Sequence, residues 1–182
     1  MKPGKKITAP ELELAVVGLI GYRRQTIVPN VSWGLGFRHE CDLVVLNPDS
    51  GYLAEIELKI SVADFRADLK KNHSHDSIYL RKLSYAMPEA VLEKVRADVP
   101  ERAGIISVKR DFRGICVARW ERQAKLNRNA VPLPADMKAH LYHLAAMRIW
   151  SLKSHLYTQR FSALREELQE LRRYYVRSQP EP

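Results

Sequence analysis

The sequence predicts an α/β fold, in which helices flank a mixed β-sheet and a long helical extension follows. Three observations support this class. Strand-like runs of apolar and β-branched residues alternate with segments that have helical apolar spacing. Two of the strand-like runs, 40–46 and 55–59, flank a turn at 47–51 that contains Pro and Gly, which predicts a hairpin. Between Pro134 and Pro180 the chain has no Gly or Pro, as expected of a long helix.

Each element has a local signal in the sequence. Residues 8–11 form a capping box with Pro in the first turn, and the helical spacing that follows ends at Gly21. A second cap signature precedes a short helix on which we expect Val62, Phe65 and Leu69 to form the buried stripe. The remaining elements are expected, in order, as a strand near 26–33, the hairpin, the helix after Ser61, a strand at 83–87, a helix from Pro88, and strands at 104–108 and 115–120.

The hairpin places acidic side chains opposite each other. If Asn47 pairs with Tyr52, the residue numbers of partners sum to a constant, and Asp42 lies opposite Glu57. Side chains alternate between faces along a strand, so Lys59 projects from the same face as both acids. Opposed carboxylates, whose Cβ atoms are about 4.5–5.5 Å apart, repel each other. This pattern therefore predicts a bound cation.

Composition limits the class of protein. The chain has 182 residues and a formal charge of +9, so its surface should attract polyanions such as nucleic acids. Its two cysteines, Cys41 and Cys116, are too few for a disulfide framework, and Cys41 is expected to be a small core residue. No apolar run reaches the roughly 18–20 residues of a membrane span, and the first residues lack the apolar stretch of a secretion signal. We therefore expect a cytoplasmic location.

The acidic and basic residues of the hairpin form a recognisable pattern. Asp42, followed by Glu57-x-Lys59, resembles the PD-(D/E)xK nuclease superfamily. The run at 61–68 is similar, more particularly, to the MmcB-like branch, which is associated with DNA repair. The sequence departs from the superfamily name at Cys41, where Pro is expected.

This resemblance covers residues 11–119 and implies a restriction-endonuclease-like fold for that part of the chain. The long carboxy-terminal region falls outside it. The expected organisation is a nuclease-like core at 1–120, a basic linker at 121–134 and a helical extension at 135–182.

The resemblance also implies a Mg²⁺ or Mn²⁺ site. Its ligands would be the carboxylates of Asp42 and Glu57 and the backbone carbonyl of Leu58, all of them hard oxygen donors. Lys59 would orient the attacking water and stabilise charge on the phosphate. Glu13, on the first helix, could add a further ligand.

Several acidic residues have alternative interpretations. The acids of the hairpin and Lys59 could be an ion-paired sheet face, although one Lys does not neutralise two acids. Glu40 lies opposite Lys59 in the assumed register, where it either forms a salt bridge or extends the metal site. Glu55 is expected to be a solvated strand residue. Capping and local pairing account for Asp64 and Asp68.

The residues expected to contact nucleic-acid phosphates are Arg66, Lys70, Lys71 and His73. A solvated helix end explains them equally well. His73 and His75, together with His39 and Cys41, could suggest zinc, but their spacing matches no structural zinc pattern.

We expect a metal-dependent endonuclease that hydrolyses DNA phosphodiester bonds, in DNA repair or in the processing of phage or mobile-element DNA. The alternatives are a catalytically silent DNA-binding or assembly protein on the same fold, and a nuclease directed at RNA. In the extension, apolar residues follow the spacing of a coiled-coil seam, which packs either on its own domain or on a second copy in a homodimer. The seam comprises Phe161, Leu164, Leu168, Leu171 and Tyr175.

Overall fold

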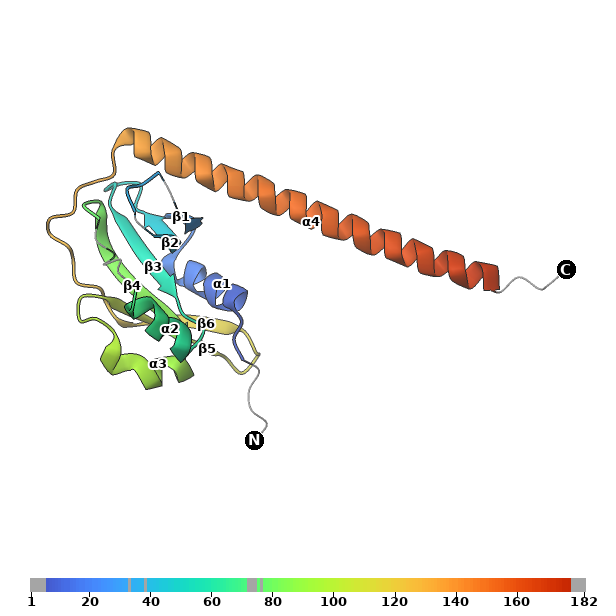
Figure 1. Cartoon of the computed structure of the whole chain (residues 1–182), viewed down its shortest axis with the longest axis horizontal. Helices are drawn as coiled ribbons and strands as arrows, with labels where there is room; N and C mark the ends of the chain where they lie inside the picture. The colour runs from blue at the N-terminus through green and yellow to red at the C-terminus, as the bar shows by residue number, and fades with distance from the viewer. Residues whose placement is uncertain (1–5, 33, 38, 72–74, 76, 178–182) are drawn as a thin grey trace. The chain divides into compact units, whose positions relative to one another are not determined.

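The computed structural model describes residues 6–32, 34–37, 39–71, 75 and 77–177. Within these residues, one six-stranded sheet has strands whose spatial order follows the chain (Figure 1). The elements are α1 (Ala9–Ile20), β1 (Thr26–Val31), β2 (Cys41–Leu46), β3 (Leu53–Leu58), α2 (Val62–Leu69), β4 (Leu80–Pro88), α3 (Glu89–Val95), the 3₁₀ turn η1 (Arg96–Asp98), β5 (Gly104–Arg110), β6 (Cys116–Arg122) and α4 (Ala135–Arg177). The predicted α/β class and the order of elements are confirmed.

The sheet is mixed. β1, β2 and β3 pair in antiparallel fashion. β4 and β5 continue the sheet parallel to β3, and β6 returns antiparallel. A parallel pair needs a crossover connection. Here α2 connects β3 to β4, and α3 with η1 connects β4 to β5.

The first helix is fixed at both ends by the residues that the sequence indicated. The amide of Thr8 donates to Glu11 Oε2 at 2.9 Å, which is half of the capping box. Gly21 ends the helix with φ of +87°, in the left-handed region that favours glycine. Arg110 Nη2 also donates to Glu11 Oε2, at 2.7 Å, and so ties the start of α1 to β5.

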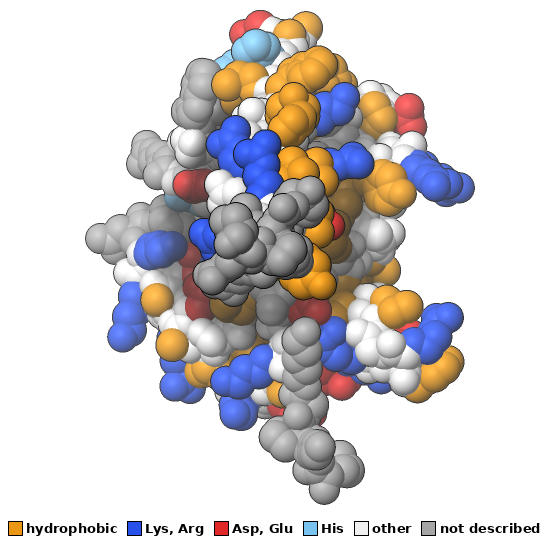
Figure 2. Space-filling view, turned by 90° about the vertical axis from the view of Figure 1, so that its right-hand side faces the viewer, with side chains coloured by type: hydrophobic (Ala, Val, Ile, Leu, Met, Phe, Trp, Pro, Cys, Tyr) orange, Lys and Arg blue, Asp and Glu red, His pale blue; other side chains and the backbone are white. Residues whose placement is uncertain are grey.

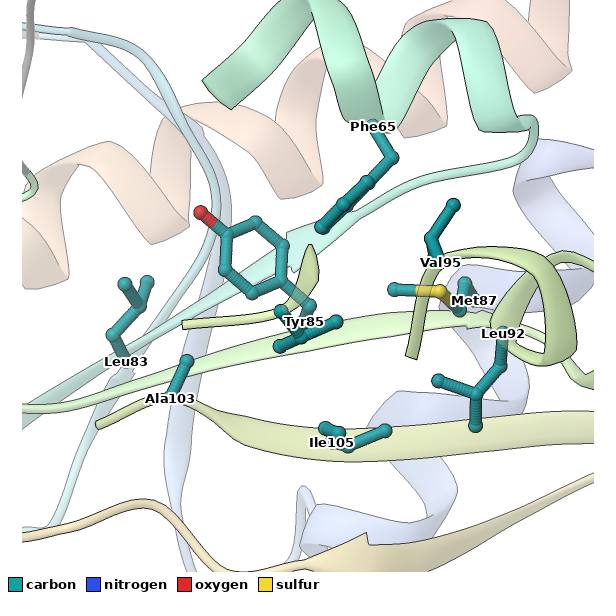
Figure 3. Packing of buried hydrophobic residues seen from close by; sticks show 9 residues of the cluster. Phe65, Leu83, Tyr85, Met87, Leu92, Val95, Ala103 and Ile105 are labelled. Carbon is teal, nitrogen blue, oxygen red and sulfur yellow. The ribbon is translucent and has the colours of Figure 1, made fainter. Parts of the chain in front are cut away.

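Both faces of the sheet are covered. Leu12 and Val16 of α1 pack on one face, against residues of β2, β3, β4 and β5. On the other face, α2 and α3 cover a second cluster, in which the rings of Phe65 and Tyr85 meet edge-on with centroids 5.4 Å apart (Figure 3). The Tyr85 hydroxyl points out of this cluster in Figure 3. The cluster consists of Phe65, Leu83, Tyr85, Met87, Leu92, Val95, Val99, Ala103 and Ile105.

The predicted stripe of α2 is wrong at one position. Leu69 is 41% exposed, whereas Asp68 is 4% exposed. Asp68 and Leu69 lie three and four residues after the buried Phe65, so helical spacing allows either of them to face inward. The ion pairs of Asp68 with Lys59 and His75 accompany its inward position. A carboxylate therefore points inward from this helix.

The segment between β6 and α4 follows the core closely. β6 extends to Arg122, two residues into the predicted linker. The amides of Lys125 and Val131 then donate to the carbonyls of Arg102 and Ile78. Leu133 is only 2% exposed. The segment is therefore fixed along the core by backbone hydrogen bonds and a buried side chain.

The chain divides into two compact units, residues 1–142 and 143–182, so that the first turns of α4 belong to the sheet unit. In the second unit, α4 exposes the apolar residues at 161, 164, 168 and 171, each by about half. Among the described helices, none has a stretch long and apolar enough to cross a bilayer.

Candidate metal centre

The hairpin of β2 and β3 has the predicted register. The amide of Asn47 donates to the carbonyl of Tyr52 at 3.1 Å. Leu43 pairs with Ile56 at the far end of the ladder, with the same sum of residue numbers. Beyond this last pair the two strands no longer pair through their backbones, and the next contact between them is a hydrogen bond to a side chain.

Asp42 occupies the place where the ladder ends. Its Oδ2 accepts a hydrogen bond of 2.7 Å from the amide of Leu58, so a side chain supplies the acceptor to the end of β3. This bond fixes the direction of the Asp42 carboxylate toward Glu57. The Asp42 side chain is 35% exposed, and the site therefore opens to solvent at this residue.

Lys59 joins the carboxylates into one cluster. Its Nζ lies 2.5 Å from Glu57 Oε2, 3.2 Å from Asp68 Oδ1 and 3.8 Å from Asp42 Oδ2. Since Asp42 and Glu57 both contact this one atom, their oxygens are no farther apart than the sum of the two distances. The prediction that Asp42, Glu57 and Lys59 project from one face is confirmed.

A second group of side chains lies beside this one. His39 and His75 both contact Glu55 Oε1, the latter through Nδ1 at 3.0 Å. His75 Nε2 is 3.6 Å from Asp68 Oδ2, which is an ion-pair separation rather than a hydrogen bond. Glu55 is fully buried, so its prediction as a solvated strand residue is wrong. The two histidines lie over it and exclude water.

The surroundings of Glu57 and Asp68 shift the pKa values of these two carboxylates in opposite directions. Burial, the strongest influence, raises the pKa of Glu57 to about 8. Lys59 opposes this shift, while the charges of Asp42 and Glu55 add to it. Burial also acts to raise the pKa of Asp68, but its cationic neighbours outweigh burial and lower that pKa below the usual range.

On the histidine side of the cluster, hydrogen bonds and opposite charges outweigh burial in setting the pKa values of Glu55 and His75. Burial acts to raise the pKa of Glu55, yet the hydrogen bonds with His39 and His75 outweigh it and lower the pKa to about 2. For His75, burial acts to lower the pKa, and the carboxylates of Asp68 and Glu55 outweigh it, raising the pKa to about 9. A buried imidazolium therefore faces buried carboxylates.

Some carboxylate oxygens of the cluster are buried without a hydrogen-bond partner among the described residues. Glu55 Oε2 and Glu57 Oε1 are buried and have no hydrogen-bond partner within the described residues. Buried polar atoms normally have a partner, because desolvation without one is costly. Four carboxylates, those of Asp42, Glu55, Glu57 and Asp68, share this region with two lysines and two histidines. The chemistry of this donor set suits a divalent cation.

The other predicted ligands have different surroundings. Glu13, on α1, is close enough to Asp42 for the Asp42 charge to raise its pKa, after burial as the main cause. Glu40 is exposed. The described carboxylates that contact Lys59 are those of Asp42, Glu57 and Asp68, and Glu40 is not among them. The Leu58 carbonyl remains a predicted ligand, on the residue whose amide holds Asp42.

Of the predicted phosphate contacts, Arg66, Lys70 and Lys71 are exposed. Lys71 Nζ also reaches Asp68 Oδ1 at 3.3 Å. His73 lies outside the described residues.

Sequence reasoning missed part of the site. The spacing of Asp68 to Phe65, three residues earlier, was compatible with an inward position, but it favoured Leu69 equally. The sequence brought His39, Cys41 and His75 to attention as a potential zinc group, but it gave no signal for the pairing of the two histidines over Glu55, because they lie in separate loops.

Fold and site together define an α/β protein with a mixed sheet and a buried acidic and histidine cluster where its β2–β3 hairpin opens. No protein-family model, curated protein or solved structure matches this chain with statistical significance.

Proposed function

We propose that this chain is a divalent-metal-dependent phosphodiesterase that cleaves DNA, on a restriction-endonuclease-like version of the mixed sheet. One observation carries the proposal: the carboxylates of Asp42, Glu57 and Asp68 converge on Lys59 at a partly open site. Three carboxylates meet at the one ammonium group of Lys59, although Lys71 and His75 also pair with Asp68. Glu57 Oε1 is left without a partner in the described chain.

Asp42 and Glu57 would hold Mg²⁺ or Mn²⁺, with Glu13 close enough to Asp42 to contribute. Such an ion would supply Lewis acidity at a phosphate oxygen and acidify a bound water. The hydrogen bond from the Leu58 amide orients Asp42 before any ligand arrives. Preorganisation of this kind supports catalysis, because the group needs no rearrangement during the reaction.

Lys59 has two roles in this proposal. Its ammonium group keeps neighbouring carboxylates together in a buried setting, where they would otherwise repel each other. It would also lie near a phosphate oxygen or an attacking water that is bound beside Asp42. A compact, hydrogen-bonding cation at this position stabilises negative charge that develops on the phosphate.

DNA is proposed as the substrate because the chain is basic. The formal charge is +9, and Lys and Arg side chains are spread over the face seen in Figure 2. Arg66, Lys70 and Lys71 are exposed on and just after α2, the helix that supplies Asp68. Contacts from such residues to phosphates give affinity without sequence preference.

Two alternatives share the fold. A catalytically silent protein would bind DNA through the same basic residues and use the helical extension to assemble with a partner. A nuclease directed at RNA would have the same site and the same charge. The gathering of carboxylates around Lys59 favours the catalytic proposal over the silent one, because phosphate binding alone gains nothing from negative charge.

The direct test is cleavage of supercoiled plasmid by the full chain with Mg²⁺ or Mn²⁺, and with EDTA as the metal-free control. We expect nicked or linear product only when the divalent ion is present. Competition with single-stranded DNA, duplex DNA and single-stranded RNA then identifies the substrate. Binding without cleavage of any of the three would support the silent alternative.

We also propose that the extension forms a homodimer. Phe161, Leu164, Leu168 and Leu171 repeat at alternating spacings of three and four, and each is 47–59% exposed. That repeat is the seam of a two-stranded coiled coil, and a second copy of the same helix offers the complementary seam. Tyr175 continues the spacing, although its side chain lies outside the described part.

Leu168→Glu should therefore convert a dimer into a monomer, because it places a charge in the seam. Gln169→Glu adds the same charge one residue away, outside the seam, and should leave the dimer intact. Sedimentation equilibrium of the full chain and both variants measures this directly. A wild-type monomer at concentrations of tens of micromolar, or equal behaviour of the two variants, would contradict the dimer.

A further inference from the structure

We propose a second cation site, formed by His39, Glu55, His75 and Glu57, which binds a first-row transition metal such as Zn²⁺. It lies next to the Asp42–Lys59 group and shares only Glu57 with it. The four residues each offer one ligand atom, and all of these atoms lie within 4.8 Å of one another.

Three of the four donor atoms already have the spacing of metal ligands. His39 Nε2, His75 Nδ1 and Glu55 Oε1 are in mutual contact, with 3.1 Å between the two nitrogens and 3.0 Å from His75 Nδ1 to Glu55 Oε1. Ligands about 2.0–2.2 Å from a tetrahedral Zn²⁺ are about 3.3–3.5 Å apart. The two edges of this triangle that end at His75 Nδ1 are therefore slightly shorter than those of a zinc tetrahedron, and the triangle would widen around an ion. Glu57 offers a fourth ligand atom within 4.8 Å of the other three.

A metal ion would replace a proton in this group. His39 Nε2 and His75 Nδ1 both contact the same oxygen, Glu55 Oε1. When His75 releases its proton, the two nitrogens and this oxygen can all offer lone pairs to one ion. A cation at their centre would then bind all three.

The unpartnered oxygens are an independent observation. Glu55 is fully buried and Glu57 is 3% exposed, yet Glu55 Oε2 and Glu57 Oε1 have no hydrogen-bond partner among the described residues. Lys59 faces the other oxygen of Glu57. A metal ligated by both carboxylates would give these buried groups the partner that they lack.

The donor types select the metal. Two imidazole nitrogens with carboxylate oxygens suit Zn²⁺, Fe²⁺ or Mn²⁺ better than Mg²⁺, which prefers an all-oxygen, largely hydrated shell. Two histidines and one glutamate, with a fourth position left for another group, are a known donor set of zinc enzymes. The thiol of Cys41 is 3.5 Å from His39 Nε2 and is buried, so the surroundings are also suited to a soft ion.

One ligand of the proposed site borders a cavity. His75 lines a cavity of about 520 Å³ together with Arg81, Lys82, Arg102 and Lys125. The basic lining also means that an anion such as phosphate could occupy the cavity beside the metal.

The test is metal binding by the tag-free full chain, measured by calorimetry with Zn²⁺ and by the visible absorption of a Co²⁺-loaded sample. We expect one tight Zn²⁺ per chain and the intense Co²⁺ bands of a tetrahedral site. His39→Ala and His75→Ala should each weaken Zn²⁺ binding by more than the roughly 10–100-fold that loss of an outer-shell partner costs. His143→Ala, on the exposed surface of α4, is the matched control and should bind as wild type.

Asp42→Asn separates this site from the proposed nuclease site. It should leave Zn²⁺ affinity and the Co²⁺ spectrum unchanged, whether or not the wild type cleaves DNA. Thermal melts without metal show whether each histidine variant is folded, and His39→Gln serves if His39→Ala is not. Wild-type Zn²⁺ affinity in folded His39 and His75 variants, or no Zn²⁺ binding by the wild type, would overturn the proposal.

Discussion

Asp42→Asn should reduce metal-dependent DNA cleavage at least about 100-fold, because it removes a charged ligand from the metal while leaving the backbone in place. Asparagine keeps a carbonyl oxygen that can accept the hydrogen bond from the Leu58 amide, so the end of β3 keeps its partner. The change therefore isolates charge from structure. Asp42 is also the most exposed carboxylate of the Lys59 group, and its stability cost should be small.

The measurement is the rate of plasmid cleavage at fixed Mg²⁺ or Mn²⁺, with a thermal melt of the same sample. Asp49→Asn is the matched control, since Asp49 is exposed in the hairpin turn that joins β2 to β3. It should cleave at the wild-type rate. Equal activity of Asp42→Asn and the wild type would remove Asp42 from the catalytic site.

Lys59→Met should destabilise the protein by about 3–5 kcal/mol at neutral pH, the loss expected when one partner of a buried ion pair is removed. Lys59 is buried and contacts Glu57 at 2.5 Å and Asp68 at 3.2 Å. Methionine matches the length and apolar character of the stem without the charge. The two acids would then be buried without their cation.

The loss of stability in Lys59→Met should become smaller as the pH falls. In the wild type, cationic neighbours hold the Asp68 pKa below 3.8, so this carboxylate stabilises the fold above that pH and loses its contribution as the pH falls. Without Lys59 the folded-state pKa of the carboxylates rises, and protonation then favours the folded variant. The difference between Lys59→Met and wild type should therefore shrink as the pH falls from 7 toward 4.

Urea unfolding at several pH values measures this difference. Lys109→Met, at an exposed position of β5, is the control and should change stability by no more than about 0.5 kcal/mol. A constant deficit from pH 7 to pH 4 would show that Lys59 acts by packing and not by charge.

Local signals in the sequence determined the order of the elements and the site at the hairpin. The capping box at 8–11, the glycine at 21 and the turn at 47–51 depend on neighbours in the chain, and they produced α1 and the hairpin where expected. Register follows from turn geometry and strand alternation, so the meeting of Asp42 with Glu57 and Lys59 was also predictable.

The rest of the site depended on tertiary structure. Glu55 has the sequence pattern of a solvated strand residue, and only the packing of His39 and His75 over it makes it a buried, paired carboxylate. Those histidines are 36 residues apart and lie in loops. Loop positions carry no periodicity that would reveal their contacts. Sequence alone therefore determined which charges share a strand face, and the fold decided which loop side chains enclose them, because burial and long-range contact depend on the whole chain.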